Sequence, residues 1–568
     1  MQFAFNELMS MHKKIFLFLS FAHFGLFAQE ISHSWVAPVG SNSSNIQAYF
    51  IDADSEGSAI SVGTFQNEVD FDPGDGVYNL LTGETIAYYI QKLDVNGNFL
   101  WAYDFPIDIA VKAITSDAEN NIYLTGDYEG IVDFDWSEDG EALEMATSSL
   151  DLFVLKLNSD GEFEDVWTFG GLNDQLGRDI AVNEEGDIAV CGGFKHMLEL
   201  GGTSLMNFGS GFDIFVLQLN SDGAVQWAYS FGDSPHDFGE SIEYDHEGNL
   251  LISGYFSETV DFDPGPAVTN ESSTGAEDAF LLKLSSTGTY IWSRSFGNAD
   301  LDIAKRLKVD EDNNIILTGD FAGTVDFDPG EDTYELTAES EVVSVFITKF
   351  DDSGEFLWAR TIGENETNCF GLDVGEDNNI YLSGFFRYDL DLDPGDGVVS
   401  YTSEGSYDVF YLALTADGDH NWSTVIGNDK PAYCRALSYH DNKLYTAGSF
   451  MTAVDFDWSD EGEDIHDYSL TLDAFVHQMQ ISPSSASLVE NDETTVKVFP
   501  NPFQNKIIIQ LPSNEDAANI TVHNLSGQVI TQLSTNQNTA TLDLDVTPGT
   551  YIVTVETANS KQNFKLIK

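Results

Sequence analysis

The sequence is poor in basic residues. It holds 23 lysines and arginines against 95 aspartates and glutamates, and only six of the 23 are arginines. The resulting formal charge of -72 repels phosphate backbones and anionic lipid headgroups, so we expect no nucleic-acid or membrane-surface partner. With so few arginines, the chain has little from which to build a guanidinium cluster for phosphate or carboxylate substrates.

Long apolar runs are missing as well, apart from one at the N-terminus. Residues 15–28 are mostly apolar, follow two lysines, and are too short to span a bilayer as a helix. We therefore predict a signal peptide over residues 1–28, with Met1 or Met11 as the start. No later stretch predicts a transmembrane segment.

Cysteines are too scarce for a disulfide framework. There are three, Cys191, Cys369 and Cys434. Cys369 and Cys434 occupy nearly matching places in neighbouring repeats, which leaves two readings open, a bridge between them or two buried thiols.

What the sequence does contain is one stretch written seven times, clearest at residues 314–363. The acidic residue that marks each copy recurs every 62 to 66 residues, at Asp70, Asp133, Glu199, Asp261, Asp326, Asp391 and Asp455. A fixed period of this kind is typical of an array of like units, none of which can bury its apolar face alone.

The tryptophans indicate how the array ends. Six units finish on a tryptophan strand, and the seventh lacks one, while Trp35 stands 66 residues ahead of Trp101 with no unit before it. A ring explains both facts, because the N-terminal strand then completes the last unit. We predict an all-β fold, a seven-bladed β-propeller over residues 29–481 with that strand closing the last blade.

Each unit predicts four short strands joined by Asn, Asp and Gly turns. At about 64 residues, a unit exceeds the roughly 40 to 45 of a compact blade. The excess follows the acidic pair and is predicted to be a long loop, where binding functions tend to lie.

Carboxylates in these loops are the candidate metal ligands. In TVDFDPG, strand alternation places Asp326 and Asp328 on one side, and Glu331 adds a third oxygen donor. Such hard donors suit Ca²⁺. The predicted ligands are Asp70, Asp72, Asp75, Asp133, Asp135, Asp326, Asp328, Glu331, Asp391, Asp393, Asp396, Asp455 and Asp457.

A structural role for the same aspartates stays open beside the metal hypothesis. Asp before Pro-Gly caps turns through its own backbone, and acids on an exposed strand can simply be solvated. In two copies Trp136 and Trp458 replace the proline, either to stack on sugars or to fold back on the protein.

The chain changes character after residue 481. Residues 482–495 are rich in Ser and acids and predict a linker. Residues 496–568 carry five lysines and five acids, so their net charge is zero, and they alternate like short strands joined by Asn, Gly and Pro turns.

Two resemblances follow from these motifs. Residues 170–194 and 278–297 resemble the bacterial β-propeller repeats called SBBP repeats, which implies an extracytoplasmic propeller over about 33–480 without a fixed activity. Residues 496–568 resemble the type A C-terminal sorting domain of the type IX secretion system of Bacteroidetes. They carry its Asn501-Pro502 start, its turn at 525–528, its Pro548–Tyr551 hairpin and a basic tail. That resemblance implies a small Ig-like β-sandwich, export by the type IX machinery, and a secreted or cell-surface protein.

The function predicted from the sequence is therefore a secreted or surface-displayed binding or adhesion module for a glycan or protein, with loops braced by calcium. Two alternatives remain, a polysaccharide-active enzyme on a propeller scaffold and a structural surface-layer component. No Ser-His-Asp order, HExxH motif or phosphate-cradling loop supports an enzyme.

Overall fold

The computed structural model describes residues 30–40, 45–137, 140–147, 149–207, 209–232, 237–338, 343–363, 366–395, 397–459, 462–466, 471–482, 497–499, 506–510, 518–524, 528–535, 539–544, 546, 550–557 and 561–567. The predicted signal peptide and most of the predicted linker lie outside these ranges. So do Asp396 and most of the sorting-domain motif positions, among them Asn501-Pro502.

The described residues are all β or irregular, and they form two units. Contacts divide the chain into unit 1, Met1–Pro483, and unit 2, Ser484–Lys568. Within the described ranges, no helix is present that is long and apolar enough to cross a membrane.

Unit 1 contains seven four-stranded antiparallel sheets, which we number along the chain. Sheet 1 consists of β2 (Gln47–Ala53), β3 (Ala59–Asp70), β4 (Asn79–Leu93) and β5 (Phe99–Asp104). Sheet 2 consists of β6 (Ile109–Ser116), β7 (Ile122–Tyr128), β10 (Asp151–Leu157) and β11 (Phe163–Phe169). Sheet 3 consists of β13 (Gln175–Val182), β14 (Ile188–Phe194), β17 (Asp213–Leu219) and β18 (Val225–Phe231).

The remaining four sheets repeat this order. Sheet 4 consists of β19 (Phe238–Tyr244), β20 (Leu250–Phe256), β23 (Asp278–Leu284) and β24 (Tyr290–Phe296). Sheet 5 consists of β25 (Ile303–Val309), β26 (Ile315–Phe321), β29 (Ser344–Phe350) and β30 (Phe356–Ile362). Sheet 6 consists of β31 (Asn368–Val374), β32 (Ile380–Phe386), β35 (Asp408–Leu414) and β36 (His420–Ile426). Sheet 7 consists of β37 (Ala432–His440), β38 (Lys443–Phe450), β41 (Asp473–Ser482) and β1 (Glu30–Val39).

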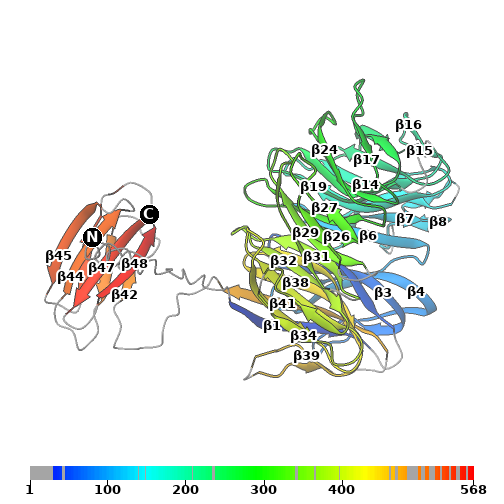
Figure 1. The fold of residues 1–568 in the computed structure, drawn as a ribbon. Helices are drawn as coiled ribbons and strands as arrows, with labels where there is room; N and C mark the ends of the chain where they lie inside the picture. The colour runs from blue at the N-terminus through cyan, green and yellow to red at the C-terminus, as the bar shows by residue number, and fades with distance from the viewer. Residues whose placement is uncertain are drawn as a thin grey trace. The chain divides into compact units, whose positions relative to one another are not determined.

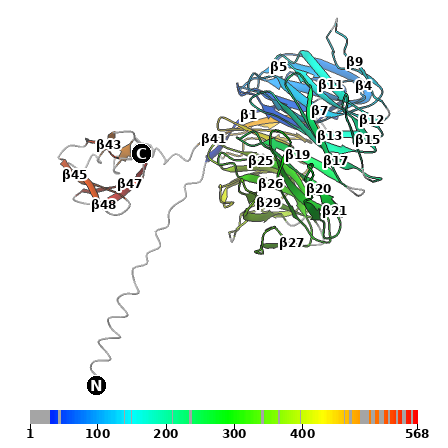
Figure 2. The same cartoon turned by 90° about the horizontal axis from the view of Figure 1, so that it is seen from above.

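Sheet 7 joins the two ends of unit 1. β1 pairs antiparallel with β41, with Trp35 opposite Gln478 and Pro38 opposite Phe475. Figures 1 and 2 both show β1 and β41 side by side. The N-terminal strand therefore supplies the fourth strand that the last repeat lacks, as the displaced tryptophan predicts.

The first strands of the seven sheets contact one another in cyclic order. β2 contacts β6, each later first strand contacts the next, and β37 of sheet 7 contacts β2 again. Each of these strands contributes buried apolar side chains, for example Ile51, Ile180, Ile242 and Leu307. Burial of these side chains supplies the main stabilisation between sheets.

In five of the seven sheets a tryptophan forms a hydrogen bond to the next sheet. The indole Nε1 of Trp35 donates a 3.1 Å hydrogen bond to the backbone O of Val95, in a hairpin turn of sheet 1. Four other tryptophans bond the matching turn of the following sheet, namely Trp101, Trp227, Trp292 and Trp358. Trp422 of sheet 6 has no such partner among the described residues. In sheet 7 that turn is replaced by the separate ends of β41 and β1.

The segment after each acidic pair is not simply a long loop, which corrects the prediction. In sheets 2 and 4–7 it forms a small hairpin, made by β8 (Ile131–Asp133) and β9 (Leu143–Met145), β21 (Thr259–Asp261) and β22 (Asn270–Ser272), β27 (Thr324–Asp326) and β28 (Glu335–Thr337), β33 (Asp389–Asp391) and β34 (Ser400–Thr402), and β39 (Val454–Asp455) and β40 (Ile465–His466). In sheet 1 it extends β3 and β4. Near sheet 3 it forms β15 (Met197–Glu199) and β16 (Ser204–Met206), and β15 also pairs with β12 (Gly171–Leu172), which precedes the first strand of that sheet. The buried valine and phenylalanine of the motif, such as Val325 and Phe327, tie the hairpin to the core.

The three cysteines are buried free thiols. Cys434 donates from Sγ to Ser383 Oγ, 3.4 Å away, and makes no disulfide with Cys369. Of the two readings left open by the sequence, the structure has the two buried thiols.

Unit 2 contains two antiparallel sheets. One consists of β42 (Lys497–Phe499), β43 (Lys506–Gln510) and β46 (Thr539–Asp543). The other consists of β45 (Val529–Thr535), β44 (Ala518–Asn524), β47 (Thr550–Thr557) and β48 (Lys561–Ile567). Ile507 of the first sheet and Ile520 and Val553 of the second belong to one buried core, so the two sheets pack face to face.

Candidate functional site

Each first strand of unit 1 carries a one-residue bulge at the same place in its register. One extra residue of the first strand lies between two successive pairs with the second strand. Bulges are frequent where a side chain must be aimed at a functional site. The seven extra residues, in sheet order, are Tyr49, Lys112, Arg178, Glu240, Lys305, Phe370 and Arg435.

A glycine on the second strand accommodates every bulge. A Cβ on any of these glycines would lie 1.9 or 2.0 Å from a backbone oxygen of the first strand, so only glycine fits there. The seven are Gly63, Gly126, Gly192, Gly254, Gly319, Gly384 and Gly448. A glycine at the same place in each otherwise apolar second strand is the sequence signal for these bulges. The bulges were not predicted from the sequence.

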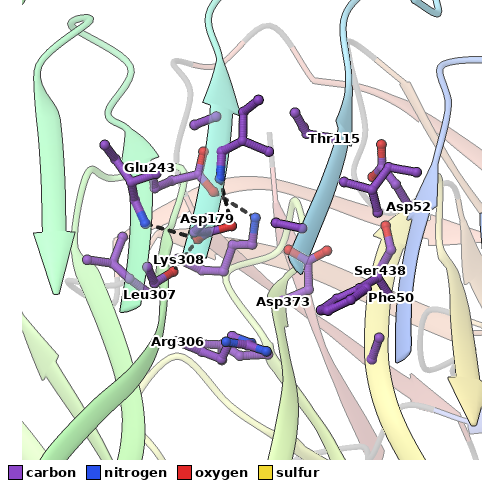
Figure 3. Close-up of a pocket in the computed structure, with 18 of the residues that line it drawn as sticks. Phe50, Asp52, Thr115, Asp179, Glu243, Arg306, Leu307, Lys308, Asp373 and Ser438 are labelled. Atoms are coloured by element: carbon purple, nitrogen blue, oxygen red, sulfur yellow. Dashed lines mark hydrogen bonds and ion pairs between the residues drawn. The ribbon is translucent and has the colours of Figure 1, made fainter. Parts of the chain in front are cut away.

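A cavity of about 190 Å³ lies where the first strands meet, lined by residues of all seven. Figure 3 shows Asp52, Asp179, Glu243, Lys308 and Asp373 gathered around it from different strands. Four of the bulge residues, Lys112, Arg178, Phe370 and Arg435, also line it. We refer to this space as the central cavity.

The charge balance of the central cavity differs from that of the chain. Its lining holds five basic and four acidic side chains, whereas the whole chain holds 23 and 95. Three of the six arginines, Arg178, Arg306 and Arg435, lie here. The sequence offers few arginines for such a group, yet half of them line one cavity, because the topology brings distant repeats to one place.

Acidic residues of the cavity lining bond to neighbouring strands. Ser116 Oγ donates to Asp52 Oδ2 at 2.6 Å, and Tyr439 N donates to Asp373 Oδ2 at 2.7 Å. Burial raises the pKa of Asp52 to about 6, although the Ser116 hydrogen bond opposes the shift. Burial also raises the pKa of Asp373. Asp52 therefore links sheets 1 and 2, and Asp373 links sheets 6 and 7. Burial disfavours the charged form of both carboxyl groups.

Glu243 and Lys308 form a 2.7 Å ion pair between sheets 4 and 5. Burial alone would lower the pKa of Lys308, but the negative charges of Glu243 and Asp373 raise it above its ordinary value. Lys308 thus stays charged, paired with Glu243 and attracted by the charge of Asp373.

Three other cations of the cavity form no ion pair within 4.0 Å, although Asp127 interacts by charge with Lys112, and Asp179 and Glu240 interact by charge with Arg306. Between residues 30 and 482, thirteen of the sixteen lysines and arginines form ion pairs within 4.0 Å. The exceptions among these described residues are Lys112, Arg306 and Arg435, and all three line the central cavity. In a chain with so many acids, this grouping marks the cavity as electrostatically distinct.

The predicted calcium ligands lie elsewhere, in the small hairpins, where they cap their own loops. Asp326 Oδ1 accepts hydrogen bonds from the backbone N of Asp328 at 3.2 Å and Tyr334 at 2.8 Å. Asp328 Oδ1 accepts one from Gly330 N at 2.8 Å. The same bonds recur at Asp70 and Asp72, Asp133 and Asp135, Asp391 and Asp393, Asp455 and Asp457, and also at Asp261 and Asp263, a pair outside the predicted set.

The hairpins do not assemble a larger acidic set. Over the described part of the chain, no three His, Cys, Asp or Glu side chains gather as a group that could hold a metal ion. Asp75 and Glu331 lie in exposed positions. Trp136 folds back onto Tyr103 and Phe105, with ring centroids 5.6 and 5.4 Å away.

Comparison with known protein families identifies the C-terminal part. Residues 497–568 match the model of a secretion system C-terminal sorting domain. The chain therefore carries a sorting tail of the type IX secretion system and is a secreted or cell-surface protein. The resemblance of unit 1 to SBBP repeats stays a prediction.

Two curated proteins are similar to part of the chain. An uncharacterised WD repeat-containing protein, L264, of Acanthamoeba polyphaga mimivirus is 25% identical over 261 residues, 40% of this chain and 18% of that protein. Regulatory protein FlaEY of Caulobacter vibrioides is 26% identical over 146 residues, 26% of this chain and 15% of that protein. The chain thus spans less than a fifth of the length of either relative.

Among solved structures, a DUF4221-family protein of Bacteroides vulgatus has a TM-score of 0.31 at 10% identity, covering 80% of this chain and 99% of that one. A Bacteroides caccae protein of unknown function has a TM-score of 0.27 at 11% identity, covering 59% and 94%. PorZ, a surface component of the type IX secretion system of Porphyromonas gingivalis, has a TM-score of 0.21 at 10% identity, covering 92% and 81%.

Proposed function

We propose that this exported protein is a binding protein whose unit 1 is a seven-bladed β-propeller with its ligand site in the central cavity. Support for the propeller comes from the seven four-stranded sheets, the cyclic contacts of their first strands, and the pairing of β1 with β41. We also propose that unit 2 is an Ig-like sandwich, because its two antiparallel sheets share one buried core. We propose the domain bounds of the sequence prediction, with 29–481 as propeller and 496–568 as sorting domain.

One observation carries the binding role. The parts of each blade that hold the ring together are nearly the same from blade to blade, namely the tryptophan and the bulge-facing glycine. The bulge residue, in contrast, differs in charge and size among the blades. A repeated scaffold with a varied polar lining at its centre is suited to present one composite site.

The experiment is a binding screen with the full-length protein and two tryptophan variants. The protein is applied to an array of extracellular polysaccharides, and Thr115→Trp fills the cavity while Thr337→Trp places the same bulk on an exposed hairpin. We expect the parent and Thr337→Trp to retain one or more glycans and Thr115→Trp to lose at least tenfold in affinity. Circular dichroism checks that all three fold.

A parent that retains nothing on the array argues against the binding role. If folded Thr115→Trp binds as the parent does, the ligand site lies outside the cavity. Retention of neither glycan nor protein ligands would favour the structural surface-layer alternative, while turnover of an added polysaccharide would favour the enzyme.

Calcium bracing of the small hairpins is a separate proposal. Each capped pair, such as Asp326 with Asp328, supplies two carboxylates, and a calcium ion there needs further oxygens from backbone or water. We expect CaCl₂ to raise the melting midpoint above that measured in NaCl of equal ionic strength, since both salts screen the -72 charge alike. Equal midpoints would exclude the metal.

A further inference from the structure

We propose that the central cavity binds one anionic sugar unit, whose carboxylate or sulfate is held by Lys112, Arg306 and Arg435. This inference rests on the proposed function and names the ligand class for the same site. The three cations come from sheets 2, 5 and 7 and converge on the cavity from different sides of the ring. A charged oxygen group placed between them would supply a closer counter-charge than Asp127, Asp179 and Glu240, which form no ion pair with them within 4.0 Å.

The two arginines are held in place without a carboxylate. Arg306 donates from Nε to the backbone O of Phe370 at 3.1 Å and from Nη1 to that of Lys305 at 2.9 Å. The guanidinium of Arg435 lies 5.3 Å from the ring centroid of Tyr433 and 5.4 Å from that of Tyr49. Fixed guanidinium groups lose little entropy when they bind an oxyanion, and their fork suits carboxylate and sulfate.

Arg435 and Lys112 also retain hydrogen-bonding capacity. Arg435 Nε is buried and has no hydrogen-bond partner among the described residues. Lys112 makes no hydrogen bond or ion pair within the same part of the chain. A buried donor without a partner costs free energy, which a ligand acceptor would recover.

The rest of the lining fits a sugar ring. Phe50 and Phe370 contribute apolar faces beside the cations, and Thr115, Ser438 and Asp52 contribute hydroxyl and carboxyl groups. Asp52 and Asp373 stand three residues beyond the bulges of their strands, about 10 Å along the strand, whereas Asp179 directly follows the bulge residue Arg178. Asp52 and Asp373 therefore lie at a different level of the cavity from the bulge residues Lys112 and Arg435. A volume of about 190 Å³ is below the roughly 300–1,000 Å³ of pockets for drug-sized ligands, so one sugar unit fits better than a chain segment.

The test is titration calorimetry on the full-length protein. The probes are galacturonic acid, galactose 6-sulfate, neutral galactose and inorganic sulfate, and the variants are Arg435→Gln and Lys112→Gln. Arg360→Gln is the matched control, since it removes the same charge from outer strand β30, where Arg360 pairs with Asp419. We expect an anionic sugar to bind, and either cavity variant to weaken it about ten- to a hundredfold, as loss of a charge-assisted hydrogen bond predicts. Arg360→Gln should bind as the parent does, and raised salt should weaken binding.

Several results would overturn the inference. If galactose or inorganic sulfate binds as tightly as the acidic sugars, an anionic sugar is not the ligand class. The same conclusion follows if both cavity variants bind the acidic sugars with the affinity of the parent. If a polysaccharide binds and Thr115→Trp abolishes binding while Arg435→Gln does not, this inference fails and the proposed function stands. If no ligand binds at all, both fail.

Discussion

Removing residues 497–568 will leave the protein inside the cell envelope and reduce its amount at the cell surface at least tenfold. These residues match the sorting domain, and export depends on recognition of that domain by the secretion machinery. No described strand of unit 2 pairs with a strand of unit 1, so the truncation leaves all seven sheets of unit 1 intact. The measurement is cell fractionation together with labelling of intact cells by an antibody against unit 1, in a host that has the type IX system.

Two controls separate sorting from folding. Unit 1 of the truncated chain should melt at the same temperature as unit 1 of the parent, which shows that unit 1 is unaffected. Val529→Ser, an exposed change on β45 that keeps the tail, should be displayed like the parent. Parental surface labelling of the truncated protein would contradict the sorting role.

Deleting β1, residues 30–39, will make the protein aggregate or unfold well below the parental melting temperature. The deletion removes every pairing partner of β41 on one side, from Ser482 to Ala474, and exposes that edge. It also removes Trp35, a half-buried side chain that packs against the core of sheet 1. A domain with a total stability of about 5–15 kcal/mol does not tolerate both losses.

Addition of a synthetic peptide spanning residues 30–40 provides the sharper measurement. The peptide should pair with β41 by strand addition and raise the melting midpoint of the deleted protein. A matched peptide with Trp35→Ala should restore much less, because it lacks the hydrogen bond to Val95 and the contact with Gly97. If the deleted protein is as stable as the parent, β1 does not close the array.

Much of the fold could be predicted because the sequence repeats seven times. The period of about 64 residues, the strand order and the displaced Trp35 can all be recognised in the sequence alone. As predicted, β1 pairs with β41 beside Phe475. The hairpins after each acidic pair were missed because three-residue strands such as β27 are too short for alternation to show. The capping role of Asp326 and Asp328 was one of two readings that the residues left open.

The cavity could not be predicted, for a reason of geometry. Lys112, Arg306 and Arg435 lie in repeats far apart in the sequence, and no local motif relates one of them to another. Only closing the ring of first strands places them around one space.

The sequence by itself determined the repeat number, the all-β class, the closing strand and the export tail. Strand alternation and turn residues are local patterns of a few residues, and here they recur seven times, while the tail carries its own motif. The tertiary structure alone decided which charges share a low-dielectric space. That depends on long-range packing of seven sheets, and neither composition nor spacing records it.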